Sequence, residues 1–98
     1  IVICGHTGKP GGFEDATAYV RSKNAAGNTV HQMMFNVQIL GGGWEGNGGD
    51  GWVRILEFYP DGKTIHVKTY SPFFGISPTT KEHAHRTGKM DDYKITIE

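Results

Sequence analysis

Short runs of alternating hydrophobic and polar residues dominate the chain, and this period of two predicts β-strands rather than helices. Two such runs, residues 17–23 and 28–40, flank a turn sequence at residues 24–27 that contains Asn and Gly. The arrangement predicts a hairpin. In the second run, every other residue from His31 to Ile39 shares one face of the strand, and we expect that face to be buried.

A second hairpin is predicted around Pro60-Asp61-Gly62, which separates residues 52–59 from residues 64–70. Proline presets the first corner of such a turn and glycine accepts a positive φ. The alternation in the returning strand places Ile65 and Val67 on the inner face.

The remaining segments complete an all-β expectation. Residues 1–4 form a continuous apolar run, which is typical of a short buried strand, and residues 94–98 alternate so that Ile95 and Ile97 point inward. Residues 71–92 hold prolines and glycines and are expected to be mostly irregular, and no window repeats apolar residues at helical spacing. We expect a single β module over residues 1–98, mainly antiparallel, as a small sheet or half of a β-sandwich with a long irregular C-terminal loop.

Composition narrows the functional classes. Ninety-eight residues make one domain, and ten Lys and Arg balance ten Asp and Glu. Without a basic surplus the chain is not expected to bind nucleic acid or an anionic membrane. Nothing resembles a membrane span or a signal peptide. The chain starts at Ile1 inside a predicted strand, which suggests a piece of a longer polypeptide, and its lone Cys4 is expected to be a buried, unreactive thiol.

One histidine stands where a strand is predicted to end. His6 follows the first apolar run in the sequence Gly5-His6-Thr7-Gly8. A sharp turn at the carboxyl end of a strand can present an imidazole to a shared site, and neutral imidazole is a common ligand for Zn, Fe or Mn. These four residues alone also fit a simple loop histidine.

The wider pattern favours a metal ligand. Four blocks occur in order: IVICGHT at residues 1–7, NAAGNTVHQ at 24–32, GGDGWVRIL at 48–56 and KTYSP at 68–72. Together they resemble the C-terminal part of calcineurin-like metallophosphoesterases, in particular their large bacterial, often secreted branch. The resemblance covers residues 1–72. It implies one sheet of a β-sandwich, built from the hairpins above, in a secreted or periplasmic parent protein.

The resemblance also implies a role for His6. It corresponds to the first histidine of the family's Gly-His-x-His motif, which helps to bind one of two divalent metal ions (Mn, Fe or Zn) that hydrolyse phosphate esters. The second histidine would fall at position 8, where this chain has Gly8. The intact parent therefore either binds one metal, uses a replacement ligand, or is inactive.

The other metal-binding blocks of that family are absent from the chain. No Asp-x-His, Gly-Asp-x-x-Asp or Gly-Asn-His sequence occurs in the 98 residues. We therefore expect the C-terminal segment of a phosphoesterase whose N-terminal catalytic half is its missing partner. The isolated chain, with no complete catalytic set, is expected to be inactive.

A second possible metal site is His83-Ala84-His85. In an extended chain the two imidazoles would share a face, and Glu82 with Asp91 or Asp92 would add ligands. An exposed polar loop explains the same residues without a metal.

The histidines and acids elsewhere have plainer explanations. His31 and His66 lie inside predicted strands and are expected to be hydrogen-bonded structural residues. The adjacent acids Glu14-Asp15 and Asp91-Asp92 are expected to point different ways and to be solvated rather than to form a catalytic pair.

An alternative hypothesis is a stand-alone β-sandwich that binds a ligand such as a carbohydrate through Trp44 and the polar residues of its glycine-rich loop, including Asp50. Trp52 opens a hydrophobic strand and is expected to pack in the core. The two hypotheses differ at residues 1–4. In a phosphoesterase segment these residues form the edge of a larger sheet, whose exposed apolar surface causes self-association; in a stand-alone module they are internal to a closed fold.

Overall fold

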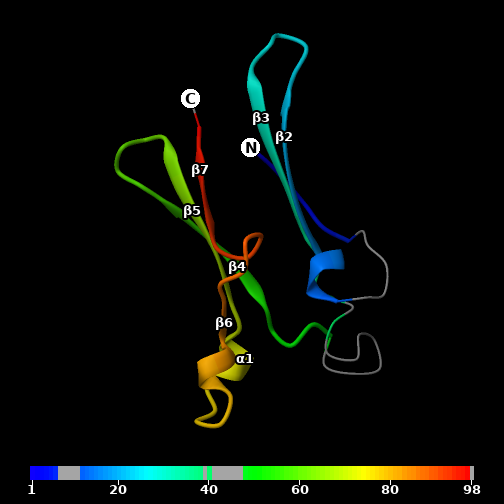
Figure 1. The fold of residues 1–98 in the computed structure, drawn as a ribbon, viewed down its shortest axis with the longest axis vertical. Helices are drawn as coiled ribbons and strands as arrows, with labels where there is room; N and C mark the ends of the chain where they lie inside the picture. Colours follow the sequence, from blue (N-terminus) through cyan, green and yellow to red (C-terminus); the bar gives the residue numbers. More distant parts are fainter. Residues whose placement is uncertain (7–11, 39, 41–47, 98) are drawn as a thin grey trace.

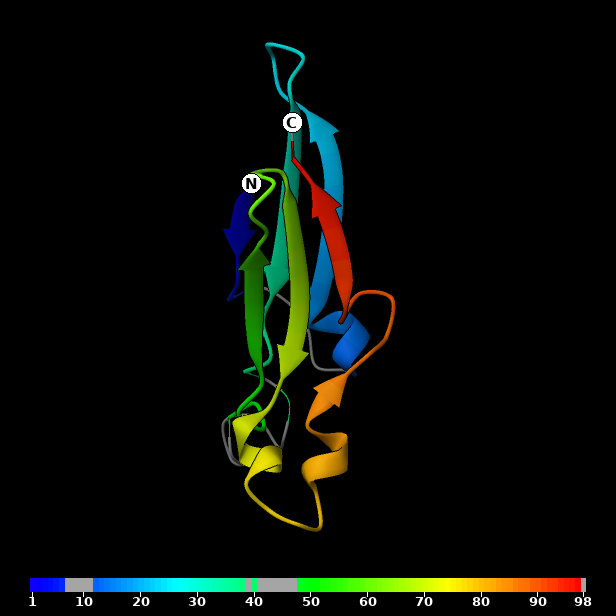
Figure 2. The same cartoon turned by 90° about the vertical axis from the view of Figure 1, so that its left-hand side faces the viewer.

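The chain folds into two β-sheets that face each other, as the computed structural model shows for residues 1–6, 12–38, 40 and 48–97 (Figure 1; Figure 2). The first sheet has the order β1-β3-β2, and the second has β4-β5-β6 with β7 also paired to β5. The expected all-β, mainly antiparallel fold is confirmed. The elements are β1 (Val2–Cys4), η1 (Phe13–Asp15), β2 (Thr17–Lys23), β3 (Thr29–Phe35), β4 (Val53–Phe58), β5 (Thr64–Tyr70), α1 (Pro72–Gly75), η3 (Lys81–His83), β6 (His85–Arg86) and β7 (Tyr93–Thr96).

The first predicted hairpin is confirmed as β2 and β3. The side-chain Oδ1 of Asn24 accepts hydrogen bonds from the backbone N–H groups of Ala26 (3.0 Å) and Asn28 (2.9 Å), which closes the turn. β3 ends at Phe35, before the predicted limit at residue 40. Its partner β2 starts opposite Phe35, at Thr17, so the pairing of the two strands ends there.

The second predicted hairpin is confirmed as β4 and β5. The carboxylate of Asp61 accepts hydrogen bonds from Thr64 Oγ1 (2.6 Å) and from the backbone N–H groups of Lys63 and Thr64 (both 2.9 Å). The bond from the Thr64 hydroxyl contributes most, with the two backbone bonds, to lowering the pKa of Asp61. The turn is thus fixed by one side chain as well as by its proline and glycine.

β1 is an edge strand, so the expectation that residues 1–4 are buried is wrong for this chain. It pairs in parallel with β3, with Ile3 opposite Met33. The exposed fractions of Ile1, Val2 and Ile3 are 49%, 48% and 58%. The expectation of a buried thiol at Cys4 is also wrong, because Cys4 is exposed. The reason is the same for all four residues: in the described chain, the only strand beside β1 is β3.

The core between the sheets is small. It joins Met33 of the first sheet to Ile65, Val67 and Ile95 of the second. These side chains are at most 2% exposed. The inward positions predicted for Ile65, Val67 and Ile95 are therefore confirmed. The partly buried hydrophobic residues packed around them are Tyr19, Leu56, Tyr93 and Ile97.

Two arginines of the second sheet stack on aromatic rings that belong to the first half of the chain. The guanidinium of Arg54 lies 4.6 Å from the ring centre of Phe35, and that of Arg86 lies 3.8 Å from that of Phe13. Arg54 also donates a hydrogen bond to Tyr93 Oη (3.3 Å). Burial lowers the pKa of Arg54, but an arginine remains charged at neutral pH.

The segment from residue 71 to residue 92 is more ordered than its sequence predicts. It contains the one-turn helix α1, the 3₁₀ helix η3 and the two-residue strand β6. Ser71 caps α1, because its Oγ accepts a hydrogen bond from the backbone N–H of Phe74 (3.2 Å), and Pro72 occupies the first helical position. A helix of one turn is too short to show an apolar period, so the pattern gave no signal. Within the described ranges, no helix has the length and apolar character needed to cross a bilayer.

Candidate functional site: the aromatic end of the sandwich

His6 lies at the end of the molecule where the parallel strands β1 and β3 both finish. The preceding residue, Gly5, runs so close to β3 that a Cβ atom there would lie 3.1 Å from the carbonyl oxygen of Phe35. His6 itself is exposed and has a φ of 60°. A positive φ is uncommon for a residue with a side chain, and such residues are concentrated at functional sites.

His6 alone does not make a metal centre. The loop after it, residues 7–11 with Gly8, lies outside the described residues. Among residues 1–6, 12–38, 40 and 48–97, no three His, Cys, Asp or Glu side chains gather into a group that could hold a metal ion. These described residues by themselves therefore do not make up the two-metal centre that the resemblance implies.

A chain of aromatic rings covers the same end of the sandwich, which we call the aromatic end (Phe13, Phe35, Trp52 and Phe74). Ring centres are 6.3 Å apart between Phe13 and Phe35, and 5.5 Å apart both between Phe13 and Trp52 and between Trp52 and Phe74. Trp52 is half-buried and packs against these rings rather than in the core between the sheets, the position predicted from its place at the start of a strand.

A pocket of about 660 Å³ opens beside these rings. Phe13, Trp52 and Phe74 form its aromatic part. Polar and charged side chains complete the lining, and those that matter below are Asp50, Glu82, His85, Arg86 and Asp91. His6 is not among the residues that line the pocket.

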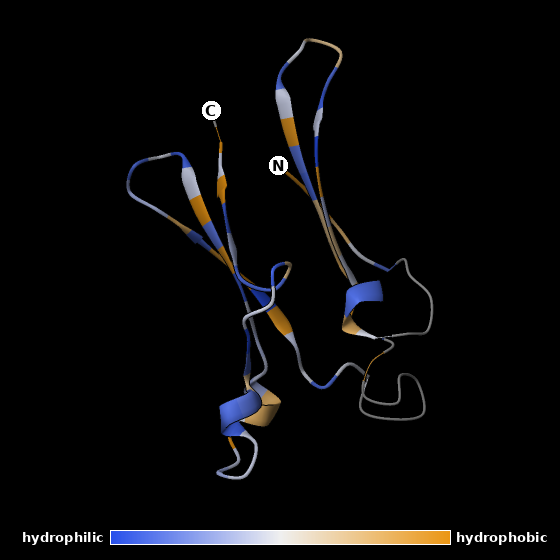
Figure 3. Ribbon diagram, in the orientation of Figure 1, coloured by the Kyte–Doolittle hydropathy of each residue, from blue (hydrophilic) through white to orange (hydrophobic). Residues whose placement is uncertain are grey.

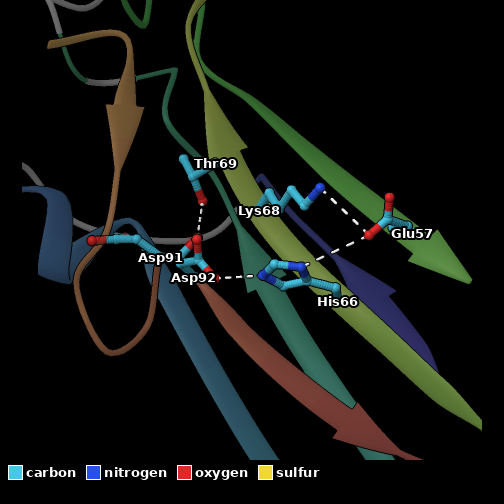
Figure 4. Close-up of polar contacts among 6 residues, drawn as sticks. All are labelled: Glu57, His66, Lys68, Thr69, Asp91 and Asp92. Carbon is cyan, nitrogen blue, oxygen red and sulfur yellow. Dashed lines mark hydrogen bonds and ion pairs between the residues drawn. The ribbon is translucent and has the colours of Figure 1, made fainter. Parts of the chain in front are cut away.

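Arg86 is held in place in this pocket. Its Nε donates a hydrogen bond to Oδ2 of the buried Asp91 (3.3 Å), while its guanidinium stacks on Phe13. The backbone carbonyl of Asp91 in turn accepts a hydrogen bond from Thr69 Oγ1 (2.7 Å), which is drawn in Figure 4. The charged group is thus positioned by a strand of the second sheet rather than by a free loop.

The structure does not assemble the metal site considered at His83 and His85. His83 ends η3, where its Nε2 lies 3.4 Å from Glu82 Oε1, and the ring of His85 in β6 packs on Tyr70 at 4.7 Å. The two histidines are separated by a helix end, so the extended geometry that would place them on one face is not formed. Of the acids proposed to join them, only Glu82 lies beside His83, since Asp91 pairs with Arg86 and Asp92 with His66.

His31 is the hydrogen-bonded structural residue that its position predicts. It is 5% exposed, and its Nδ1 lies 2.5 Å from Tyr19 Oη. The two rings also stack, with centres 6.0 Å apart. The hydrogen bond satisfies a polar group that would otherwise be buried without a partner.

His66 belongs to a polar cluster on the outer face of the second sheet (Figure 4). Its Nε2 lies 2.5 Å from Asp92 Oδ1, and its Nδ1 lies 3.8 Å from Glu57 Oε1. Lys68 Nζ lies 3.4 Å from the same glutamate oxygen. Asp92 thus turns to a different partner from its neighbour Asp91, so these adjacent acids do not form a pair.

The sequence did not identify the pocket itself. The alternative binding site centred on Trp44 falls in residues 41–47, outside the described residues. No sequence pattern predicts that Phe13, Phe74 and Arg86 lie together, because they come from three separate segments. Their only local signal is that each lies in or beside a turn at the end of a strand.

Comparisons with known proteins give one similarity. The chain is similar to the uncharacterized protein YvnB of Bacillus subtilis (strain 168), with 32% identity over 69 residues. This region makes up 70% of the chain but 5% of YvnB, so the chain spans only a small part of that relative. No family model matches the chain, and no solved structure matches it. These comparisons therefore assign no activity to the chain.

Proposed function

We propose that the chain is the C-terminal segment of a metal-dependent phosphoesterase of the calcineurin-like type. The intact parent hydrolyses phosphate esters with divalent metal ions, and this segment contributes a β-sheet and His6. The proposal rests on the four sequence blocks in residues 1–72 and on the character of β1.

The observation that carries the proposal is that β1 is apolar on both faces. Ile3 and Val2 point to opposite sides of the sheet, yet both are about half exposed, at 58% and 48%. Figure 3 shows the hydrophobic colouring of this strand at the edge of the first sheet. A parallel strand with apolar residues on both faces is typical of a sheet covered on both sides. β1 pairs in parallel with β3, which supports a place inside a larger layered domain.

The rest of the first sheet supports the same conclusion. Its outer face carries Val20, which is 54% exposed, in the same row as Val2. The molecule exposes 6478 Å² in all. A compact chain of this mass is expected to expose about 5,500 Å². We take the N-terminal half of the parent to be the partner that covers β1 and this outer face.

The chain's own contribution to the metal centre is one imidazole. His6 stands at the carboxyl end of β1, where side chains of a parallel sheet meet a common site. The metal ions themselves would activate water and stabilise the negative charge on the phosphate. Since Gly8 has no ligand atom, the ligand that this position would supply must come from another residue, or the parent must work with fewer.

The alternative, a stand-alone binding module, predicts that β1 lies within a closed sheet. The exposed edge at Ile1, Val2 and Ile3 favours the phosphoesterase segment instead.

The first test is the coding sequence upstream of Ile1. We expect it to encode Asp-x-His and Gly-Asp-x-x-Asp motifs in one reading frame with this chain. The second test is hydrolysis of bis-p-nitrophenyl phosphate and p-nitrophenyl phosphate, with Mn²⁺, by the parent protein and by this chain alone. We expect activity from the parent only.

His6→Ala in the parent is expected to lower activity by more than about 10-fold, the scale of losses seen when groups around a metal are removed. His83→Ala is the matched control, because its side chain is 72% exposed and its loss removes the same imidazole elsewhere. Equal activity of the two variants would show that His6 is not a ligand. An upstream sequence without the two motifs would overturn the phosphoesterase proposal as a whole.

A further inference from the structure

We propose that the pocket at the aromatic end binds a neutral carbohydrate, in the form of a short oligosaccharide. The rings of Trp52 and Phe74 receive the C–H face of a sugar, and the charged side chains at the rim bond its hydroxyl groups. This site is separate from the proposed metal chemistry of His6.

The pocket has the size for such a ligand. Its volume of about 660 Å³ lies within the roughly 300–1,000 Å³ of pockets that bind small molecules. It also combines the two kinds of surface that a sugar ring needs. One face of a pyranose carries several C–H groups and behaves as an apolar plate, while its edge carries hydroxyl groups that must remain hydrogen-bonded when water is displaced.

The aromatic part of the pocket is suited to stacking. The ring planes of Trp52 and Phe74 are inclined at 71° to each other, so the two rings line adjacent sides of the pocket. Both rings are partly exposed. Rigid aromatic side chains provide a large contact area and lose little conformational freedom on binding.

The charges around the pocket argue against an ionic ligand. The guanidinium of Arg86 is already paired with the buried Asp91, and the carboxylates of Asp50 and Glu82 repel a phosphate or another anion. A further cation is also disfavoured, because the positive charge of Arg86 already lies at the aromatic part of the pocket, 3.8 Å from the ring centre of Phe13 and 6.0 Å from that of Trp52. A neutral ligand with many hydroxyl groups suits both signs, since a hydroxyl donates to a carboxylate and accepts from a guanidinium.

The polar rim is organised before a ligand arrives. Arg86 is fixed by Asp91 and by Phe13, and His85 is packed on Tyr70. Side chains that are already held in one position lose little freedom on binding, which favours affinity.

The test uses the 98-residue chain without added metal. Cellotriose, maltotriose, mannotriose and chitotriose are each titrated while tryptophan fluorescence and saturation-transfer NMR are recorded. We expect saturable binding of at least one trisaccharide, with a Kd of about 1 mM or lower. Inorganic phosphate and choline are expected not to displace it. Absence of saturable binding by all four sugars, or displacement by phosphate or choline, would overturn the proposal.

Variants locate the binding. Trp52→Leu is expected to weaken binding at least about 10-fold, because it removes the stacking surface. Glu82→Gln is expected to weaken it about 3-fold or more, because it replaces a charge-assisted hydrogen bond by a neutral one. Glu82 is 79% exposed, so this variant keeps the fold even if Trp52→Leu does not.

Glu57→Gln makes the same chemical change on the outer face of the second sheet and is expected to bind like the wild type. Wild-type affinity in Glu82→Gln, or equal losses in Glu82→Gln and Glu57→Gln, would place the sugar elsewhere and refute the proposal. Because no metal is present, the outcome is independent of whether the parent is a phosphoesterase.

Discussion

Gly27 and Gly49 both have a positive φ, but they differ in what surrounds them. At Gly27, with φ of 85°, an added Cβ would meet nothing within 4 Å. At Gly49, with φ of 116°, it would lie 2.6 Å from the carbonyl oxygen of Val37. The carbonyl of Gly49 also accepts a hydrogen bond from the backbone N–H of Trp52 (3.2 Å), so this glycine sets where the aromatic end begins.

The contrast predicts different costs for the same substitution. Gly27→Ala is expected to lower the free energy of unfolding by about 1 kcal/mol, the cost of a left-handed conformation for a residue with a Cβ. Gly49→Ala is expected to lower it by more than about 2 kcal/mol, because the backbone must also move away from Val37. Urea denaturation followed by circular dichroism measures both. Equal losses in the two variants would mean that the close approach at Gly49 relaxes at no cost.

The residues of the candidate sites show what sequence can and cannot reveal. His6 could be selected from the sequence because it follows an apolar strand directly, and its ligand role stays a prediction. The pocket could not be selected, since Phe13, Trp52 and Arg86 meet only through the packing of two sheets. Sequence patterns report local structure, whereas this pocket exists only where non-local contacts form.

At the scale of elements, strands are predicted best where a turn fixes both partners. The bounds of β2 and β5 agree with the pattern at both ends, because each hairpin turn has its own hydrogen-bonded side chain, Asn24 or Asp61. β3 is shorter than its alternation suggests, since alternation continues beyond the last paired residue. β1 has a strand sequence, but among the described strands only β3 lies beside it, so it stays exposed. The hydrophobic pattern shows that a segment can form a strand. Only the folded structure shows which strands lie beside it.

The turn at Asp61 makes the second hairpin sensitive to acid. Its pKa in the folded chain is lowered from the ordinary value of 3.8, mainly by the hydrogen bond from Thr64. The folded state therefore binds its proton less tightly than the unfolded state does. The stabilising contribution is present above pH 3.8 and is lost as the pH falls through the lower, folded-state pKa.

We expect Asp61→Asn to be less stable than the wild type at neutral pH, and to lose less stability as the pH is lowered into the acid range. Urea midpoints measured across that range test this expectation. Glu82→Gln, at an exposed site near the other end of the molecule, controls for the general loss of one negative charge. Parallel pH curves for the wild type and Asp61→Asn would exclude a role for this carboxylate in acid sensitivity.

At the scale of the whole molecule, the chain is elongated and thin. Its principal extents are 46 × 30 × 16 Å and its radius of gyration is 14.9 Å. A compact domain of this length has a radius of gyration of about 12.6 Å. The small core around Met33 and the exposed outer face of the first sheet agree with this shape. Both features indicate a fold that gains stability when its apolar face is covered.

We therefore expect the isolated chain to associate with itself through β1 and the outer face of the first sheet. Val20→Lys is expected to shift the chain toward the monomer in sedimentation velocity, because it places a charge in that face. Since Val20 is 54% exposed, the change in the free energy of unfolding should stay within about 1 kcal/mol.

Val53→Lys is the matched control, because Val53 is 41% exposed and lies in the other sheet. It is expected to leave the association unchanged. A monomeric wild type, or the same shift toward the monomer with Val53→Lys, would argue against association through the first sheet.

The stacking of Arg54 on Phe35 and of Arg86 on Phe13 has a consequence for how the two sheets separate. Guanidinium chloride supplies a flat cation of the same chemistry as these side chains, and at molar concentration it competes for the same ring faces. Urea carries no charge and cannot replace an arginine in this way. Guanidinium chloride should therefore weaken the contact between the sheets by displacing these arginines, which urea cannot do. As a result, the two sheets can separate in guanidinium chloride before either unfolds, whereas in urea they unfold together.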